Sequence, residues 1–320
     1  MITGLNRSGT TFLYQLMAKA SGSWMAPAYY ETEAHPVLTP GQPDARKEKA
    51  QAVLDVLTEF MPELLSMHEL HLTEPHEDIS IFMASMVPWQ MSLIYDMPEW
   101  TEFLKSEKGQ RARGAAFRMH KRWLQHLQNN RRVEHGNEFV EQRRWLLKYP
   151  FVTMELPHFL EVYPDATFIV CHRDPADVML SWLQIIKAIH LNGNELAKEE
   201  VYNEVTVVGF DFIKWLMEGL LSFREEHRDM EDRFIDIAFV QFTADPLKVV
   251  RQIYSRLDKK MSDEEECQLK AAIEQKQREH VERKAKRNTV QWSDFGITRA
   301  DVEKELAPYY TWLRSKELLA

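Results

Sequence analysis

The sequence predicts an α/β protein in which helices flank a parallel β-sheet. Residues 167–171 form an apolar, β-branched run, which is typical of a buried parallel strand. Residues 233–239 read as a second, alternating strand, and residues 1–3 lead directly into a glycine-containing loop and a helix. Because helical segments separate these strands, the order predicts a three-layer parallel sheet.

The remaining elements follow from periodicity and from the residues that break it. A helix is expected after the loop at 11–20, and residues 34–44 are proline-rich and irregular. Further segments are expected as helices at 45–59, 111–129, 156–162, 195–228 and 263–286 and as a strand at 140–148, with Asn129, Asn130 and Gly136 as breaks. We expect a single domain, residues 1–320, whose helical insertion at about 40–135 folds over a cleft at the carboxyl ends of the strands.

The loop that follows residue 3 has the spacing of a phosphate-binding P-loop, GxxxxGK[ST]. Gly4 and Gly9 fill the glycine positions and Thr11 fills the Ser/Thr position. Thr10 replaces the lysine that handles the β- and γ-phosphates of a triphosphate, and Arg7 supplies a cation inside the loop instead. Such a loop still cradles one phosphate with N–H groups at a helix N-terminus. The alternative is a plain glycine turn before an amphipathic helix.

A second phosphate site is predicted where the strand at 167–171 ends. Asp174 reads as an N-cap and Pro175 as the first helical residue, so the strand passes directly into a helix. Arg173 sits at the strand's carboxyl end, and Ser181 lies about two turns into the helix. The guanidinium and the hydroxyl are placed to hold a phosphate between them. The alternative is an ordinary strand-to-helix junction with a surface arginine.

The two motifs together resemble the P-loop sulfotransferases that use 3′-phosphoadenosine 5′-phosphosulfate (PAPS). The loop is similar to that family's 5′-phosphosulfate loop in GLNRSGTTFL, and the second motif to its 3′-phosphate motif in RDPADVMLS. Residues 145–150, 163–168 and 293–297 resemble further family segments, so the likeness covers essentially the whole chain. The resemblance implies transfer of a sulfuryl group from PAPS to an acceptor hydroxyl or amine, in line and without a metal.

The resemblance also implies roles for single residues. Arg7 and the loop residues Ser8, Gly9, Thr10 and Thr11 would bind the donor and balance charge on its leaving 5′-phosphate. Lys148 would reach the bridging and sulfuryl oxygens, unless it is merely an exposed lysine at a strand end.

The general base is not fixed by the resemblance. Phenol and steroid members use a histidine two residues beyond the lysine, and that position here is Pro150. Other members use a glutamate beyond the loop helix, so the prediction is Glu31, with His35 next. Either could instead be a solvated loop residue.

Two further segments bear on the donor. Lys284 and Arg287 belong to a basic run at the place where the family closes a loop over the 3′-phosphate, although a solvated helix end fits equally well. Phe239 stands where many members have tyrosine, which puts a tyrosine contact to the adenine in doubt.

For the acceptor, residues 82–100 are rich in methionine and aromatic side chains, Met86 and Trp89 among them, and suggest a hydrophobic pocket or plain core. Histidines and acids at residues 68–78 match no metal-ligand spacing and read as an acidic loop lining the acceptor cleft. We therefore expect a small-molecule, lipid or carbohydrate acceptor with an apolar part, and no metal.

Composition limits the remaining classes. A net charge of −9 argues against a nucleic-acid partner. Two cysteines, no secretory segment and no long apolar run favour a cytoplasmic protein, although the leading strand is so short that the natural start could lie upstream. The rival functions are a nucleotide or sugar kinase with a degenerate loop and an inactive nucleotide-binding protein.

Overall fold

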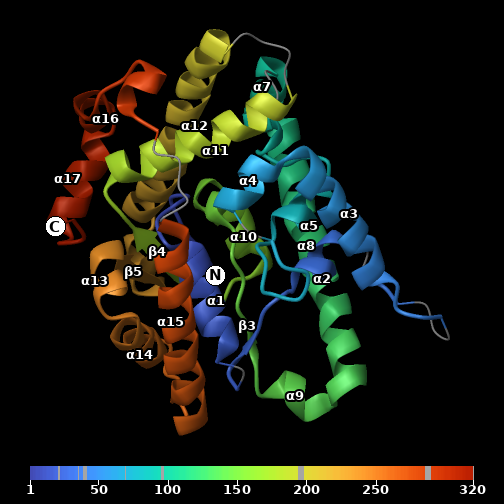
Figure 1. Ribbon diagram of the computed structural model, residues 1–320. Coiled ribbons are helices and arrows are strands. Elements are labelled where there is room, and N and C mark those ends of the chain that lie inside the picture. Colours follow the sequence, from blue (N-terminus) through green and yellow to red (C-terminus); the bar gives the residue numbers. More distant parts are fainter. Residues whose placement is uncertain are drawn as a thin grey trace.

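The computed structural model describes residues 1–20, 22–34, 36–38, 42–68, 70–94, 97–193, 198–284 and 290–319 (Figure 1). Three parallel strands form the central sheet in the order β1–β4–β5, with β1 at Ile2–Gly4, β4 at Phe168–His172 and β5 at Phe234–Ala238. The register pairs Gly4 with Cys171, so β1 and β4 end at the same edge.

A second parallel pair, β2 at Trp24–Met25 and β3 at Arg144–Trp145, extends this sheet. Beyond β3 the chain runs beside β1, where Ile2 donates its N–H to the Leu147 carbonyl at 2.8 Å and accepts from the Tyr149 N–H at 3.2 Å. The carboxyl ends of β1, β4 and the β3 segment therefore meet at one edge.

Alternate side chains of each central strand enter two separate cores. Ile169 and Ile237 pack into one, while Phe168 and Phe234 pack into the other. This two-residue period is what a sheet covered on both faces requires. On the first face lie α1 (Thr10–Lys19), α13 (Phe239–Ala244), α14 (Pro246–Arg256) and α15 (Asp263–Lys284). On the second lie α10 (Leu156–Val162), α11 (Pro175–Gly193), α12 (Lys198–Glu226), α16 (Arg299–Glu305) and α17 (Ala307–Ser315). The predicted α/β architecture is thus confirmed.

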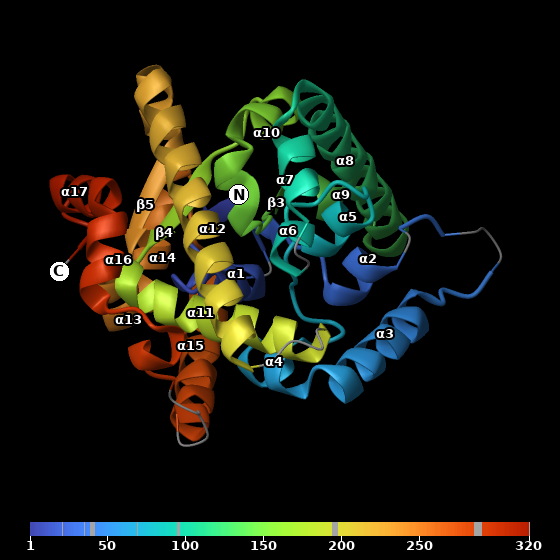
Figure 2. The same cartoon turned by 90° about the horizontal axis from the view of Figure 1, so that it is seen from above.

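The chain between β2 and β3 is helical. It contains α2 (Tyr29–Glu33), α3 (Arg46–Phe60), α4 (Pro62–Met67), α5 (Ile79–Met83), α6 (Met91–Ile94), α7 (Pro98–Lys105), α8 (Glu107–His135) and α9 (Asn137–Glu141). Figure 2 shows α8 and α3 on the side of the molecule opposite α17. Among the described helices, none combines the length and the apolar character that crossing a membrane requires.

Two predicted elements differ from the structure. The strand expected at 140–148 begins only at Arg144, because residues 137–141 form α9. The helix expected at 111–129 is longer at both ends: the Ser106 side chain caps its start by accepting from the Gly109 N–H at 3.2 Å, and Gly136, with φ 90°, follows its end. The asparagine pair at 129–130 does not stop it, since Asn130 turns its side chain to the Pro36 carbonyl at 2.8 Å.

Gly4 is a position in this fold that tolerates a side chain poorly. Its φ is 122°, and an added Cβ would lie 2.3 Å from the Cys171 carbonyl oxygen in the neighbouring strand.

We expect Gly4→Ala to lower the free energy of unfolding by roughly 2–5 kcal/mol in urea denaturation, through backbone strain and overpacking. Gly114→Ala in α8 is the matched control, because the added atom meets nothing closer than 3.5 Å and should change stability by about 1 kcal/mol at most. Similar losses in both variants would contradict this explanation.

Candidate active site

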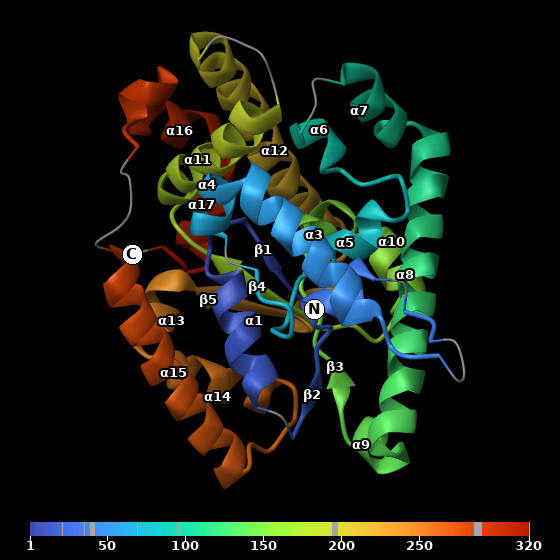
Figure 3. The same ribbon diagram turned by 45° about the vertical axis from the view of Figure 1, so that its right-hand side comes forward.

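The amino-terminal loop joins β1 to α1 at the carboxyl edge of the sheet. Gly9 precedes α1 in a left-handed conformation with φ 94°, and Arg7 is also left-handed with φ 68°. The Ser8 hydroxyl donates to the Leu5 carbonyl at 2.6 Å, which closes the loop on itself. No acidic residue occupies the first turn of α1, whose free N–H groups and helix dipole therefore favour an anion. Figure 3 shows α1 beside the central sheet. A helix start of this kind is compatible with the predicted phosphate cradle.

The second motif has the predicted cap. Helix α11 begins at Pro175, and the Asp174 carboxylate accepts from the Ala176 N–H at 2.9 Å. The same carboxylate oxygen accepts from the Tyr310 hydroxyl at 2.7 Å, so α17 holds the helix start in place. This arrangement fixes where Arg173 and Ser181 project.

The two motifs are in direct contact. Arg7 donates from Nε to the Ser181 hydroxyl oxygen at 3.0 Å, and Arg173 donates from Nη1 to the Arg7 carbonyl at 3.1 Å. The Arg173 guanidinium also lies over the Phe239 ring, 4.6 Å from its centroid, so the phenylalanine that replaces the expected tyrosine packs against this arginine. Arg173 belongs to this junction and is not a solvated surface residue, with 27% of its side chain exposed.

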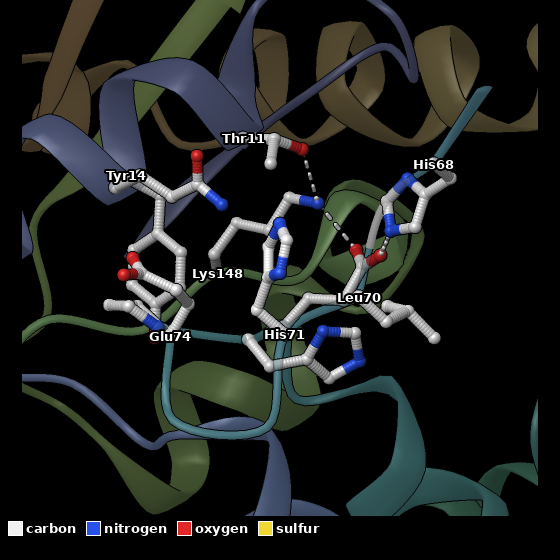
Figure 4. A pocket seen from close by; sticks show the side chains of 11 residues that line it. Thr11, Tyr14, His68, Leu70, His71, Glu74 and Lys148 are labelled. Carbon is white, nitrogen blue, oxygen red and sulfur yellow. Dashed lines mark hydrogen bonds and ion pairs between the residues drawn. The ribbon is translucent and has the colours of Figure 1, made fainter. Parts of the chain in front are cut away.

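Lys148 projects toward the start of α1. Its Nζ donates to the Thr11 hydroxyl at 3.2 Å and to the Glu77 carboxylate at 2.6 Å (Figure 4). Only 3% of the residue is exposed, so the alternative of an exposed strand-end lysine is wrong. The other Glu77 oxygen lies 3.4 Å from His68 Nε2. The buried Lys148 ammonium, the Glu77 carboxylate and the His68 imidazole thus lie next to one another in space, beside the amino-terminal loop.

The Lys148 pocket is the small pocket lined by Lys148, by Thr11, Tyr14 and Gln15 of α1, and by the side chains of residues 68, 70, 71 and 74–77. Most of the segment expected to line an acceptor cleft, residues 68–78, thus lines a pocket beside Lys148. In the part of the chain that the structure describes, no group of histidines, cysteines and acids is arranged to hold a metal ion.

Burial and neighbouring charges shift the pKa values of the ionisable groups in this pocket. Burial alone would raise the pKa of Glu77, but Lys148 and the neighbouring histidines lower it to about 2. Burial lowers the pKa of His76 to about 3, and it lowers the pKa of His68 although Glu77 acts in the opposite direction. At neutral pH these two imidazoles are uncharged, and Glu77 is an anion paired with Lys148.

Backbone contacts hold Glu77 in this position. The Asp78 N–H donates to the Lys148 carbonyl at 2.9 Å, and the His76 N–H donates to the Pro27 carbonyl at 2.9 Å. Asp78 is fully buried, 3.5 Å from the His120 ring, and burial raises its pKa. Because Lys148 and Glu77 are bridged through the backbone as well as through their side chains, their distance is set by the fold.

The other predicted site residues lie elsewhere or outside the described part. Glu31 is buried, and its Oε2 accepts from Arg131 Nη2 at 2.6 Å and from the Ala28 N–H at 2.9 Å. His35 and Arg287 lie outside the described residues, and of Lys284 only the backbone in α15 is described.

The two residues named for a hydrophobic acceptor pocket or for core packing, Met86 and Trp89, differ in burial. Met86 is 76% exposed, whereas Trp89 is buried, donates its indole N–H to Glu155 and lies under the Arg113 guanidinium at 5.0 Å. Neither residue lines the Lys148 pocket. The methionine and aromatic content of this segment supplies core packing and surface.

The chain matches a protein-family model and two solved structures over most of its length. A model of the sulfotransferase family matches residues 1–263. Sulfotransferase STF9 from Mycobacterium avium is similar in structure, with a TM-score of 0.73, 19% identity, and coverage of 98% of this chain and 75% of that one. Sulfotransferase STF1 from Mycobacterium tuberculosis H37Rv has a TM-score of 0.72 and 19% identity, covering 96% and 75%. No curated protein matches the chain significantly. The two structures share the fold, and the family model, which spans most of the chain including the loop, α11 and Lys148, shows that the chain belongs to the sulfotransferase family.

Proposed function

We propose that this protein transfers a sulfuryl group from PAPS to an acceptor hydroxyl or amine, in line and without a metal. The contact between Arg7 and Ser181 carries the proposal, because it brings two predicted phosphate sites to one edge of the sheet. A nucleotide with phosphates at both ends of its ribose matches two such sites. The whole chain would act as one domain, since the insertion supplies His68 and Glu77 to the pocket at Lys148.

The donor would lie across the two motifs. The N–H groups of Ser8, Gly9, Thr10 and Thr11 would hold the 5′-phosphate at the start of α1. Arg173 and Ser181 would hold the 3′-phosphate, with the guanidinium already oriented by Phe239. The basic segment with Lys284 and Arg287 would close over the same phosphate.

In the transfer, the bond from sulfur to the bridging oxygen of the donor breaks and a bond from sulfur to the acceptor oxygen or nitrogen forms. Negative charge develops on the leaving 5′-phosphate. Arg7 and Lys148 balance that charge, the latter from a buried position where an ammonium acts most strongly. The acceptor's proton must pass to a base.

Of the carboxylates considered, Glu77 is placed best to be that base. It faces Lys148 in the pocket, whereas Glu31 is committed to Arg131 and to the cap of α2. When Lys148 turns to the leaving oxygen, Glu77 loses its ion partner and becomes more basic. Glu31 and His35 are the alternatives, and comparison of Glu77→Gln with Glu31→Gln tests the first of them.

The rival functions are less well supported. A kinase would need a phosphate-binding lysine in the loop, where this chain has Thr10. An inactive nucleotide-binding protein would not need Lys148 paired with a carboxylate beside the loop.

Arg173→Ala tests the 3′-phosphate site. Because a charge-assisted hydrogen bond is lost, calorimetry should show adenosine 3′,5′-bisphosphate binding weakened by about 10- to 100-fold, with a much smaller loss for adenosine 5′-phosphate. Arg228→Ala, which removes an exposed arginine elsewhere, is the control. If the variant leaves the ratio of the two nucleotide affinities unchanged, Arg173 does not bind the 3′-phosphate.

Glu77→Gln tests the base. Turnover with labelled PAPS, per folded molecule, should fall by roughly 10²–10⁴-fold while bisphosphate affinity falls far less, because the proton acceptor is lost. Stability should fall as well, since buried Lys148 loses its ion partner. Glu31→Gln should mainly lower stability, since it removes the ion partner of the partly buried Arg131. If turnover per folded molecule drops more in Glu31→Gln than in Glu77→Gln, the base is Glu31.

A further inference from the structure

Helix α3 carries a stripe of exposed apolar side chains along its outer face. Val53, Val56 and Phe60 are 42%, 54% and 64% exposed, and their spacing puts them on one side of the helix. The side that faces the protein holds the two buried residues of α3, Arg46 and Ala50. Figure 2 shows α3 at the rim of the molecule. Single exposed apolar residues are ordinary on a protein surface, whereas a row of them indicates an interaction site.

The stripe has the spacing of a coiled-coil seam. Lys49, Val53, Val56 and Phe60 are separated by four, three and four residues, which is the alternation of a and d positions in a heptad repeat. Such a seam is narrower than the apolar face with which a helix usually packs on its own domain. Because α3 contacts its own domain through Arg46 and Ala50, the seam is available to a second helix.

The charges of α3 run in the order opposite to the one that stabilises a lone helix. Lys47 and Lys49 outnumber Glu48 near its start, whereas Glu59 lies in a last turn that contains no basic residue. Lys49 and Glu59 form no ion pair with any residue in the described ranges. Cations are disfavoured at a helix N-terminus and anions at a C-terminus.

An antiparallel helix of the same sequence compensates both ends. It brings its own acidic end beside the basic start of the first helix, and its basic end beside the acidic last turn. A partner of a single charge sign, such as a nucleic acid or an anionic membrane, would suit one end of α3 and be repelled by the other. The charge pattern therefore favours a second copy of this chain.

We infer that α3 is the interface for a second copy of this chain, with the two α3 helices packed antiparallel about a twofold axis. With the axis between residues 54 and 55, Val53 packs on Val56 of the second copy, and Lys49 packs beside Phe60 and Glu59 of the second copy. The axis repeats each contact. The seam is only roughly 16 Å long, so the dimer belongs to the weak class, with a Kd on the order of 10 μM.

Sedimentation velocity of the full chain tests this interface. The protein should pass from monomer to dimer between about 1 and 200 μM. Phe60→Asp should weaken the dimer by at least about 30-fold, because the axis brings the added carboxylate into the seam twice. Val133→Asp is the matched control: Val133 is even more exposed, at 82%, but it lies on α8, so the dimer should persist. A chain that stays monomeric, or a dimer that Phe60→Asp leaves intact, would overturn the inference.

Charge reversal tests the antiparallel arrangement. Lys49→Glu and Glu59→Lys should each weaken self-association by at least about threefold, since like charges then face each other at both ends of the seam. Mixed in equal amounts, the two variants should form a heterodimer that is tighter than either homodimer, because one variant is acidic at both positions and the other is basic at both. A folding defect cannot produce this gain. Mixing without a gain would exclude the antiparallel pairing.

A different occupant of the stripe gives a different result. If the protein stays monomeric and floats with vesicles of phosphatidylcholine and phosphatidylglycerol, and Phe60→Asp abolishes that binding, the stripe faces a membrane and the inference is wrong. None of these measurements needs a sulfuryl donor or an acceptor, so their outcome is independent of the proposed function.

Discussion

The contact between the amino-terminal loop and helix α11 is the constraint on which the rest of the site depends. It arises from the sheet, because β1 and β4 lie in parallel register and end together at Gly4 and Cys171. The backbone of Gly4 must pass against the Cys171 carbonyl, and only a residue without Cβ fits there. From that edge the loop turns so that Arg7 meets Ser181 and Arg173 meets the loop backbone. Two predicted anion sites, separated by 166 residues of sequence, thus come into contact.

Lys148 connects the strand segment after β3 and the helical insertion to the surface formed by the amino-terminal loop and α11. The chain beyond β3 pairs with β1, which places the ammonium beside Thr11. A buried ammonium needs a partner, and the insertion returns Glu77 to provide it. Lys148 and the neighbouring histidines lower the pKa of Glu77 against the effect of burial, whereas burial itself keeps His76 uncharged at neutral pH. Charge balance in the pocket is therefore set by residues from three separate parts of the chain.

Local signals were sufficient for much of the fold and for the local structure of the two predicted phosphate motifs. Asp174 and Pro175 marked the start of α11, and the periodicity of residues 156–162 gave α10 its bounds, because caps and apolar spacing act within a few residues. The partner of Lys148 could not be chosen this way, since Glu77 lies 71 residues away on an irregular segment whose path depends on the whole insertion. Sequence reasoning favoured Glu31, whose carboxylate is held by Arg131 from α8. The choice between an apolar pocket and plain core at residues 82–100 stayed open for a related reason: methionine and tryptophan content does not reveal that Trp89 packs inward while Met86 faces solvent.

The most direct test of the account is calorimetric titration of the protein with adenosine 3′,5′-bisphosphate and with ATP, both without magnesium. If the loop and the Arg173–Ser181 turn jointly hold a ribose phosphorylated at both ends, the bisphosphate binds at least about tenfold more tightly than ATP. Equal affinities, or tight ATP binding that appears only when magnesium is added, would mean that the two elements do not serve one such nucleotide.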